Sequence, residues 1–253
     1  MLSRLVAIAL ITVSVSSAGR AQSDSVARRK TLIVGERLTY DVKLGPLRVG
    51  KASMEVVGIE TVRDRPTWHT RFQVSGGTLF FRVDDVLESW IDTATFSSLR
   101  FRQQLSEGSR ERFYEYEIFP ERAIYAERGK PEKPSVSLPL DDGSFLYFLR
   151  TITLEVGATY EFERYFVPEK NPVRLDVLRT EAIEVPAGKF DALVIRPTIK
   201  AKGVFSESGR AQVWISNDEN HLLLQMTSHL KFGTLSLHLR SRAFRPQPDT
   251  SDH

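Results

Sequence analysis

The chain has 253 residues, with 35 Lys+Arg against 32 Asp+Glu, abundant aromatic residues (15 Phe, 7 Tyr and 3 Trp) and no cysteine. The absence of cysteine excludes disulfides, thiolate metal sites, a cysteine nucleophile and a lipidated N-terminal cysteine. The length is sufficient for one large β domain or two small ones.

Residues 1–21 have the pattern of a secretory signal peptide. Arg4 supplies the positive start, and the apolar run Leu5–Val15 is too short to span a bilayer. The alternative, an uncleaved membrane anchor, is weaker because polar residues interrupt the run. Removing residues 1–21 takes away two arginines and no acid, so Lys+Arg falls from 35 to 33 against 32 Asp+Glu. We therefore expect an exported, nearly neutral protein, periplasmic or secreted, that does not bind nucleic acid.

The first half of the chain alternates like β-sheet after a flexible leader at 22–34. Leu38, Tyr40, Val42 and Leu44 alternate with polar residues, which predicts a half-buried strand. Gly76-Gly77 predicts a bend or bulge before the next strand. Further strands are predicted at Lys51–Glu60, Thr67–Val74, Thr78–Val83, Val86–Ile91, Leu99–Leu105, Arg112–Phe119 and Ala123–Glu127.

A single short helix is predicted near the middle of the chain, at about 142–152. Four apolar residues with the spacing i, i+3, i+4 and i+7 share one face: Phe145, Phe148, Leu149 and Ile152. Asp141 or Asp142 could cap the first free N–H groups. Ser144, Tyr147 and Arg150 recur every third residue on the opposite, polar side. A lone short helix is marginal in water, so we expect it to pack on the concave face of a curved sheet.

Strand patterns resume after the helix and run to a polar tail at 246–253 that we expect to be disordered. The predicted strands are Thr159–Val167, Val173–Glu184, Ala192–Lys200, Ala211–Ser216, Leu222–Leu230 and Leu235–Leu239. No composition break divides residues 35–245, so one domain is expected. The predicted fold is all-β, a strongly curved antiparallel sheet or half-open β-barrel with one short helix. No stable transmembrane span is expected after cleavage of the signal peptide, because irregular patterning, the helix and a proline-rich loop fit a soluble fold better than a transmembrane barrel.

Several fragments in order resemble DUF3108, a family of bacterial exported proteins of unknown function. The helix residues Asp141, Ser144, Tyr147 and Arg150 fit its D-x-x-S-x-x-Y-x-x-R pattern. The other matching fragments are Gly35–Tyr40, Gly50–Ala52, Phe81–Asp85, Glu88–Asp92, Val185–Phe190 and Val213–Ser216, with Pro197 and Asp218. The resemblance covers roughly residues 35–240 and implies an exported, β-rich envelope protein. By looser analogy such folds look like the open β-barrels that carry lipoproteins or lipids across the periplasm.

The motifs of common enzymes are absent from the sequence. Ser144 precedes a helix but is not in a G-x-S-x-G nucleophile elbow, and Asp92 lacks the glycine of an aspartic-protease motif and is interpreted as a turn residue. The histidines show no metal-ligand spacing, and there is no glycine-rich phosphate loop. We therefore predict no catalytic residue, no metal and no cofactor.

The candidate residues for a ligand-binding site are Ser144, Tyr147 and Arg150. Arg150 could bind a carboxylate or phosphate, with Tyr147 lining an apolar cavity. The alternative is that Arg150 pairs with a carboxylate of the sheet and locks the helix in place. Three functional hypotheses follow: a non-enzymatic carrier of an apolar or lipidic envelope ligand, an envelope assembly or scaffold protein that binds other proteins through an exposed sheet edge, and, least favoured, a hydrolase.

Overall fold

The computed structural model describes residues 32–78, 81–108, 110–200, 211–230 and 233–245. The expected signal peptide, most of the expected leader and the C-terminal tail at 246–253 lie outside the described residues. Leu32, at the end of the expected leader, is 5% exposed and belongs to the apolar core, so the packed part of the chain begins before residue 35.

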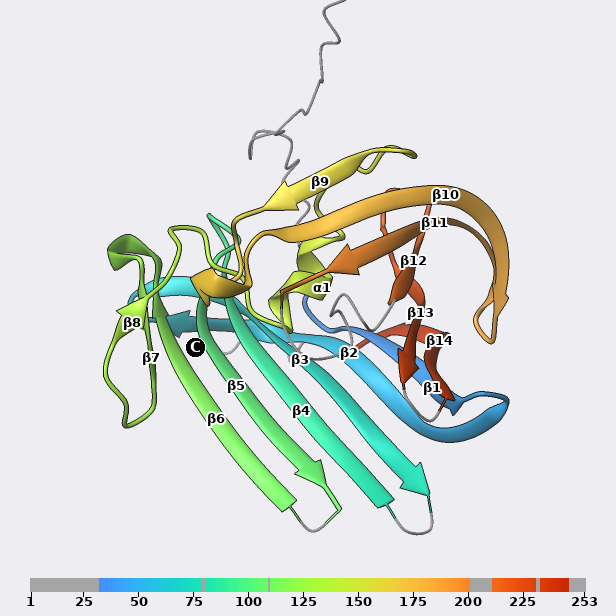
Figure 1. Cartoon of the computed structure of the whole chain (residues 1–253), viewed down its shortest axis with the longest axis horizontal. Helices are drawn as coiled ribbons and strands as arrows, with labels where there is room; N and C mark the ends of the chain where they lie inside the picture. The colour runs from blue at the N-terminus through green and yellow to red at the C-terminus, as the bar shows by residue number, and fades with distance from the viewer. Residues whose placement is uncertain (1–31, 79–80, 109, 201–210, 231–232, 246–253) are drawn as a thin grey trace, which may run out of the picture.

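The described strands form one antiparallel sheet in the order β8-β7-β6-β5-β4-β3-β2-β1-β14-β13-β12-β11-β10-β9. Neighbours in the sheet are neighbours in sequence except at β1–β14, where the first and last strands join the two halves. Because β8 and β9 are edges, the barrel stays half-open (Figure 1). The strands are β1 Glu36–Leu44, β2 Leu47–Val62, β3 Arg65–Thr78, β4 Phe81–Asp92, β5 Ser98–Glu107, β6 Arg110–Phe119, β7 Ile124–Glu127, β8 Lys133–Pro134, β9 Thr159–Phe162, β10 Val173–Val185, β11 Gly188–Thr198, β12 Gln212–Ser216, β13 Leu223–Leu230 and β14 Gly233–Phe244. The predicted fold class is confirmed.

Several strands begin or end a few residues from their predicted bounds, and the short strand β8 was not predicted. The two strands expected at Thr78–Val83 and Val86–Ile91 are one strand, β4, and the strand expected at Thr159–Val167 ends as β9 at Phe162. The bend expected at Gly76-Gly77 is wrong, because β3 continues through both glycines in register with β4. Gly76 is instead required by close packing, since a Cβ there would lie 2.5 Å from the Cα of Gly50 on β2.

The helix α1, Ser144–Phe148, is shorter than the predicted 142–152. Its end tightens because the Arg150 amide donates to the Tyr147 carbonyl, and both the amide and the hydroxyl of Thr151 donate to Phe148. All five helical residues are buried, so the expected polar side of the helix also faces protein.

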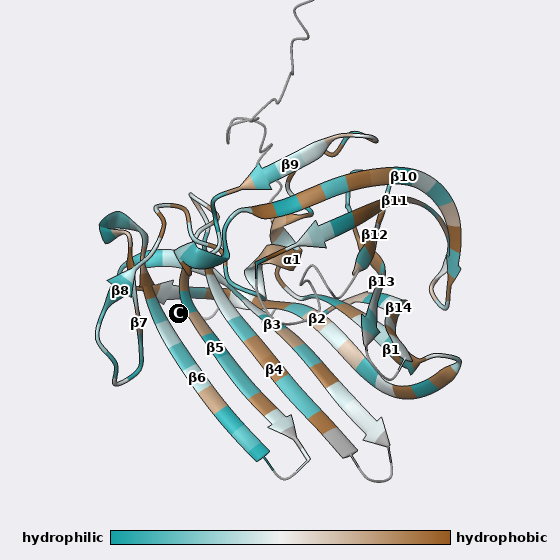
Figure 2. Cartoon of the chain, in the orientation of Figure 1, coloured by the Kyte–Doolittle hydropathy of each residue, from teal (hydrophilic) through white to brown (hydrophobic). Residues whose placement is uncertain are grey.

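The core lies between α1 and the concave face of the sheet. Tyr40 and Met54 from the first strands, Phe101 from β5 and Ile195 from β11 are each 1% exposed or less within it. Strands β3 to β6 project beyond the helix as a long four-stranded wing (Figure 1), along which hydrophobic and hydrophilic residues alternate (Figure 2). A small second cluster of Val62, Trp90 and Leu99 lies on the outer face of the same strands.

Candidate functional site

The start of α1 is fixed to β4 by a buried carboxylate. Asp141 Oδ1 accepts hydrogen bonds from the amides of Gly143 and Ser144, both at 2.8 Å, and from Ser89 Oγ at 2.6 Å. Gly143 permits this approach, because a Cβ at that position would lie 2.6 Å from Ser89 Oγ. Burial raises the pKa of Asp141 to about 6, despite these hydrogen bonds. The sequence prediction of an aspartate cap is confirmed, with Asp141 as the capping residue.

Ser144 is fully buried and its hydroxyl makes three hydrogen bonds, one of which it donates to the Asp141 carbonyl at 3.2 Å. The hydroxyl lies 2.9 Å from Ser98 Oγ on β5 and accepts a hydrogen bond from the Asp141 amide at 2.8 Å. This arrangement joins the first turn of the helix to the sheet.

Tyr147 and Arg150 extend the attachment of the helix to β1 and β2. Tyr147 Oη donates to the carbonyl of Glu55 at 3.0 Å. Arg150 binds both carboxylate oxygens of Glu36, at 2.6 and 3.2 Å, and Arg242 binds the same carboxylate from β14. Burial favours the neutral acid at Glu36, but the hydrogen bonds and charge of Arg150, reinforced by Arg242, hold its pKa below the usual range.

The structure therefore brings Ser144, Tyr147 and Arg150 into one region, and each side chain has a partner within the protein. Arg150 pairs with Glu36, which is a carboxylate of the sheet. Such a pairing was predicted from the sequence as the alternative to ligand binding. A ligand-binding role for the three residues stays a prediction.

A second polar group lies beside the helix start, where Asp142 faces the sheet. Tyr165 Oη donates to Asp142 Oδ1 at 2.8 Å, and Gln103 of β5 reaches Oδ2 at 3.3 Å. Burial raises the pKa of Asp142, and it raises that of Tyr165 further above its ordinary value. Sequence patterns missed this group because Tyr165 falls in a segment that was predicted as strand.

Beyond the helix, the concave face of the wing is an apolar strip that is only half-buried. Phe72 and Val74 of β3 and Leu87 of β4 pack against the core and retain partial exposure. Tyr116 on β6 also packs against the core, and Val83 on β4, Leu105 on β5 and Tyr114 on β6 continue the strip outward. The register places the polar residues Asp85, Gln103 and Arg112 on the same face, between these apolar side chains. The rings of Tyr114 and Tyr116 lie 6.4 Å apart and nearly parallel. We call the apolar side chains of this face, which α1 does not cover, the concave strip.

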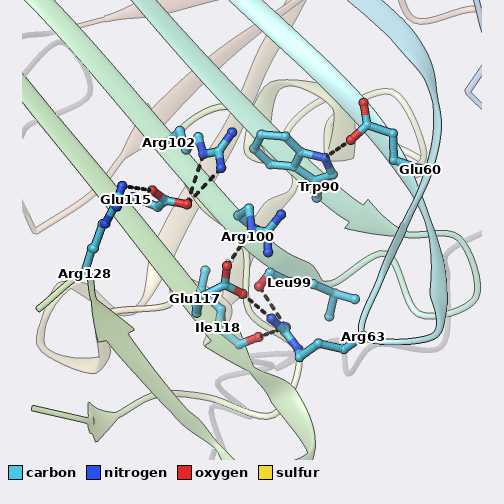
Figure 3. Close-up of polar contacts among 10 residues, drawn as sticks. All are labelled: Glu60, Arg63, Trp90, Leu99, Arg100, Arg102, Glu115, Glu117, Ile118 and Arg128. Carbon is cyan, nitrogen blue, oxygen red and sulfur yellow. Dashed lines mark hydrogen bonds and ion pairs between the residues drawn. The ribbon is translucent and has the colours of Figure 1, made fainter.

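The convex face of the same strands carries a ladder of cross-strand ion pairs (Figure 3). Arg102 binds Glu115 at 2.9 Å, and Arg128 approaches the same carboxylate at 3.3 Å. Arg100 and Arg63 both bind Glu117. A depression of about 550 Å³ lies beside the ladder and is lined by side chains of both signs, among them Lys130 and Glu132. Mixed charge of this kind is typical of a solvated sheet face.

Trp90 is buried under the ladder, although it is on the convex face. The ring of His69 stacks on it at 4.4 Å, the guanidinium of Arg102 lies 5.0 Å from its centroid, and its indole N–H donates to Glu60 at 2.6 Å. His69 in turn lies within hydrogen-bond distance of Glu60 and Glu88. The cross-strand pairing of His69 with Trp90 was not identified from the sequence, since it depends on the register of β3 with β4.

Other residues considered for chemistry have structural roles. Asp92 accepts hydrogen bonds from the amides of Ala94 and Thr95 and pairs with Arg65 at 2.7 Å, which confirms its interpretation as a turn residue. His229 and His238 do not face each other across their hairpin, because they pair with Thr234 and Gln225. Within the described ranges, no group of three or more acidic or histidine side chains could hold a metal ion, and no helix there is long and apolar enough to cross a membrane.

These features define a class: a half-open, antiparallel β-barrel-like protein with a buried helix at one end. The fold is similar to that of a β-barrel-like protein of DUF1849 from Brucella abortus, with a TM-score of 0.51 and 10% identity over 86% of this chain and 100% of that chain. The family model of DUF3108, described as proteins of unknown function, matches residues 39–240, so the chain belongs to the DUF3108 family.

Two further structures are similar over most of their lengths but superpose less well. One is described as a lipoprotein candidate from Parabacteroides distasonis, with a TM-score of 0.39 and 13% identity over 86% of this chain and 99% of that chain. The other is described as an exported-protein candidate with a YmcC-like fold from Bacteroides fragilis, with a TM-score of 0.31 and 11% identity over 84% of this chain and 97% of that chain. No curated protein matches the chain.

Proposed function

We propose that this protein is an exported, non-enzymatic binding protein whose concave strip takes up an apolar envelope ligand, such as the acyl chain of a lipid. The observation that carries the proposal is the strip itself: apolar side chains of β3 to β6 that remain half-exposed on the inner face, where a soluble protein normally completes its core. The signal-peptide pattern at 1–21 supports export to the compartment where such ligands occur.

Two further features support this proposal over the alternatives. Ser144, the residue that a hydrolase hypothesis would require, is fully buried and hydrogen-bonded to Ser98, which favours a structural role. The helix occupies the barrel at the end of the strip, so a ligand lying on the strip would meet Leu87 and Gln103 beside the helix start. Each CH₂ group of an acyl chain that is buried there would contribute roughly 0.8 kcal/mol to the binding free energy, because it loses contact with water.

The test is binding of a naturally fluorescent fatty acid, cis-parinaric acid, to the mature protein and to two variants of β5. Leu105→Glu places a charge within the concave strip, whereas Gln104→Glu places the same charge on the exposed convex face one residue away. We expect Leu105→Glu to weaken binding at least tenfold and Gln104→Glu to leave it within about twofold, since an apolar ligand would have to remove the new carboxylate at 105 from water, even though Arg112 lies opposite it.

Native mass spectrometry of protein purified gently from the periplasm provides an independent measurement. We expect an additional mass that organic extraction removes and that Leu105→Glu reduces. Equal binding by both variants, or a bare protein mass that lipid extracts do not shift, would contradict the proposal.

A further inference from the structure

Among the described residues, the outer half of β6 pairs with a strand on one side only, that of β5. β7 pairs only with Tyr116–Phe119 of β6, the Arg128 amide takes the outward carbonyl of Glu115, and no described strand lies beside Arg110–Tyr114 on that side. In Figure 1 this part of β6 forms the free border of the wing. The stretch without a described backbone neighbour, Arg110–Tyr114, is about 17 Å long at the usual strand rise.

The hydrogen-bonding direction of this edge follows from one observed bond. The Arg128 amide donates to the Glu115 carbonyl at 2.8 Å, so the backbone of Glu115 points away from β5. Successive residues of an antiparallel strand alternate between their two neighbours. The N–H and C=O groups of Glu111 and Phe113 therefore point outward as well, while those of Arg112 and Tyr114 point toward β5.

This edge exposes an aromatic ring between two carboxylates, which a partner strand could contact. Phe113 is 56% exposed on the convex face, between Glu111 and Glu115. A strand lying beside it would bury this ring and place its own side chains opposite the two carboxylates.

Pairing with a second copy of the chain is disfavoured by charge. An antiparallel pair of two β6 edges can match five residues in only two registers. One register places Arg112 opposite Arg112 of the other copy, and the other places Glu111 opposite Glu115 twice. Like charges directly opposite each other are destabilising, and natural edge strands use them to prevent self-association. The edge is thus protected against its own copies but open to a strand of complementary charge.

We propose that Arg110–Glu115 of β6 is a docking site for an extended segment of another polypeptide, which adds to the sheet as an antiparallel strand. The partner segment carries a basic residue opposite Glu111, an apolar residue opposite Phe113 and an acidic residue opposite Arg112. This site is on the border of the wing and is distinct from the concave strip, so it does not depend on ligand binding.

The test uses two synthetic hexapeptides of identical composition, read by amide hydrogen exchange in NMR spectra of the mature protein. The sequence Lys-Tyr-Val-Glu-Lys-Glu is complementary to residues 115 to 110, and Glu-Tyr-Val-Lys-Glu-Lys reverses the charges. We expect millimolar complementary peptide to slow exchange at Glu111 and Phe113 at least fivefold. Exchange at Arg112 and Tyr114 should not change, because their amides already bind β5.

Two substitutions separate backbone pairing from side-chain contact. Phe113→Pro removes one outward N–H without removing a bond to β5 and should abolish the protection. Phe113→Thr keeps the N–H and should bind within about threefold of the native chain. Equal protection by both peptides, no protection at Glu111 and Phe113, or a dimer in sedimentation that Phe113→Pro dissolves would overturn the proposal. The peptide comparison on the native chain stands alone if Phe113→Pro fails to fold.

Discussion

Polar groups on the two faces of strands β3 to β6 have opposite environments. On the concave face, Asp141 and Ser144 are removed from water and hydrogen-bonded to fixed partners in the protein, among them Ser89 and Ser98 of the sheet. On the convex face, arginines and glutamates pair across strands while retaining contact with solvent, as Arg102 does with Glu115. The inner polar groups therefore specify the position of the helix, whereas the outer charges mainly keep a broad sheet soluble.

The largest difference is expected between removing a buried arginine that anchors the helix to β1 and removing one on the convex face of β5. Arg150→Met leaves the buried carboxylate of Glu36 with Arg242 alone, and we expect a loss of about 3 kcal/mol in the free energy of unfolding. Arg102→Met on the convex face should cost about 1 kcal/mol or less. Urea unfolding of the two variants measures both values, and similar costs would contradict the proposed contrast.

Asp141 on the inner side and Glu88 on the convex face should contribute to the pH dependence of stability with opposite signs. Asp141 has a folded-state pKa of about 6, above its ordinary value of 3.8, so the folded protein holds a proton that the unfolded chain releases between about pH 4 and 6. Its contribution is favourable at low pH and is lost as the pH rises through 6. Asp141→Asn should remove this dependence, which amounts to about 3 kcal/mol at most.

On the convex face the sign is reversed. Hydrogen bonds from His69 and Arg71, partly opposed by burial, lower the pKa of Glu88 to about 2. This contribution is present above the ordinary pKa of 4.5 and is lost as the pH falls toward 2. Glu88→Gln should flatten the acid limb of the stability profile and leave the region near pH 6 unchanged. Chemical denaturation at a series of pH values distinguishes the two variants.

A smaller effect is expected from the contact that seats the helix on β4. Gly143→Ala adds a methyl group at 2.6 Å from Ser89 Oγ, in a backbone conformation that alanine adopts freely, so its cost of about 1–2 kcal/mol reports the contact alone. In a Ser89→Ala background the added methyl group should cost less than half as much. Additive free energies in this double-mutant cycle would show that the two residues do not meet.

The smallest effect is expected in the ladder of the convex face. Glu115→Gln should reduce the free energy of unfolding by about 0.5 kcal/mol at low ionic strength, and by less in 1 M salt, because exposed pairs are screened. Thermal unfolding at two salt concentrations measures the effect. A loss that is large and independent of salt would place the ladder among the interactions that specify the fold.

Sequence alone determined the fold class, the place of the helix and the order of most strands, because alternation and helical period are local properties of the chain. Leu38 to Leu44 and Phe145 to Ile152 carry these signals directly. The boundaries were less accurate where tertiary contacts decide: α1 ends early because Thr151 bonds back to Phe148, and Gly76 serves close strand packing rather than a bend.

Only the tertiary structure decided which polar residues meet. The partners Glu36 and Arg150 are separated by 114 positions, and the attachment of Asp141 to Ser89 depends on the register of the sheet. The same holds for the free edge of β6, because the sequence of Arg110–Glu115 resembles that of any amphipathic strand. Pairings between distant residues leave no periodic signal in one sequence, and they arise from the closure of β1 on β14 and the packing of the helix within the barrel.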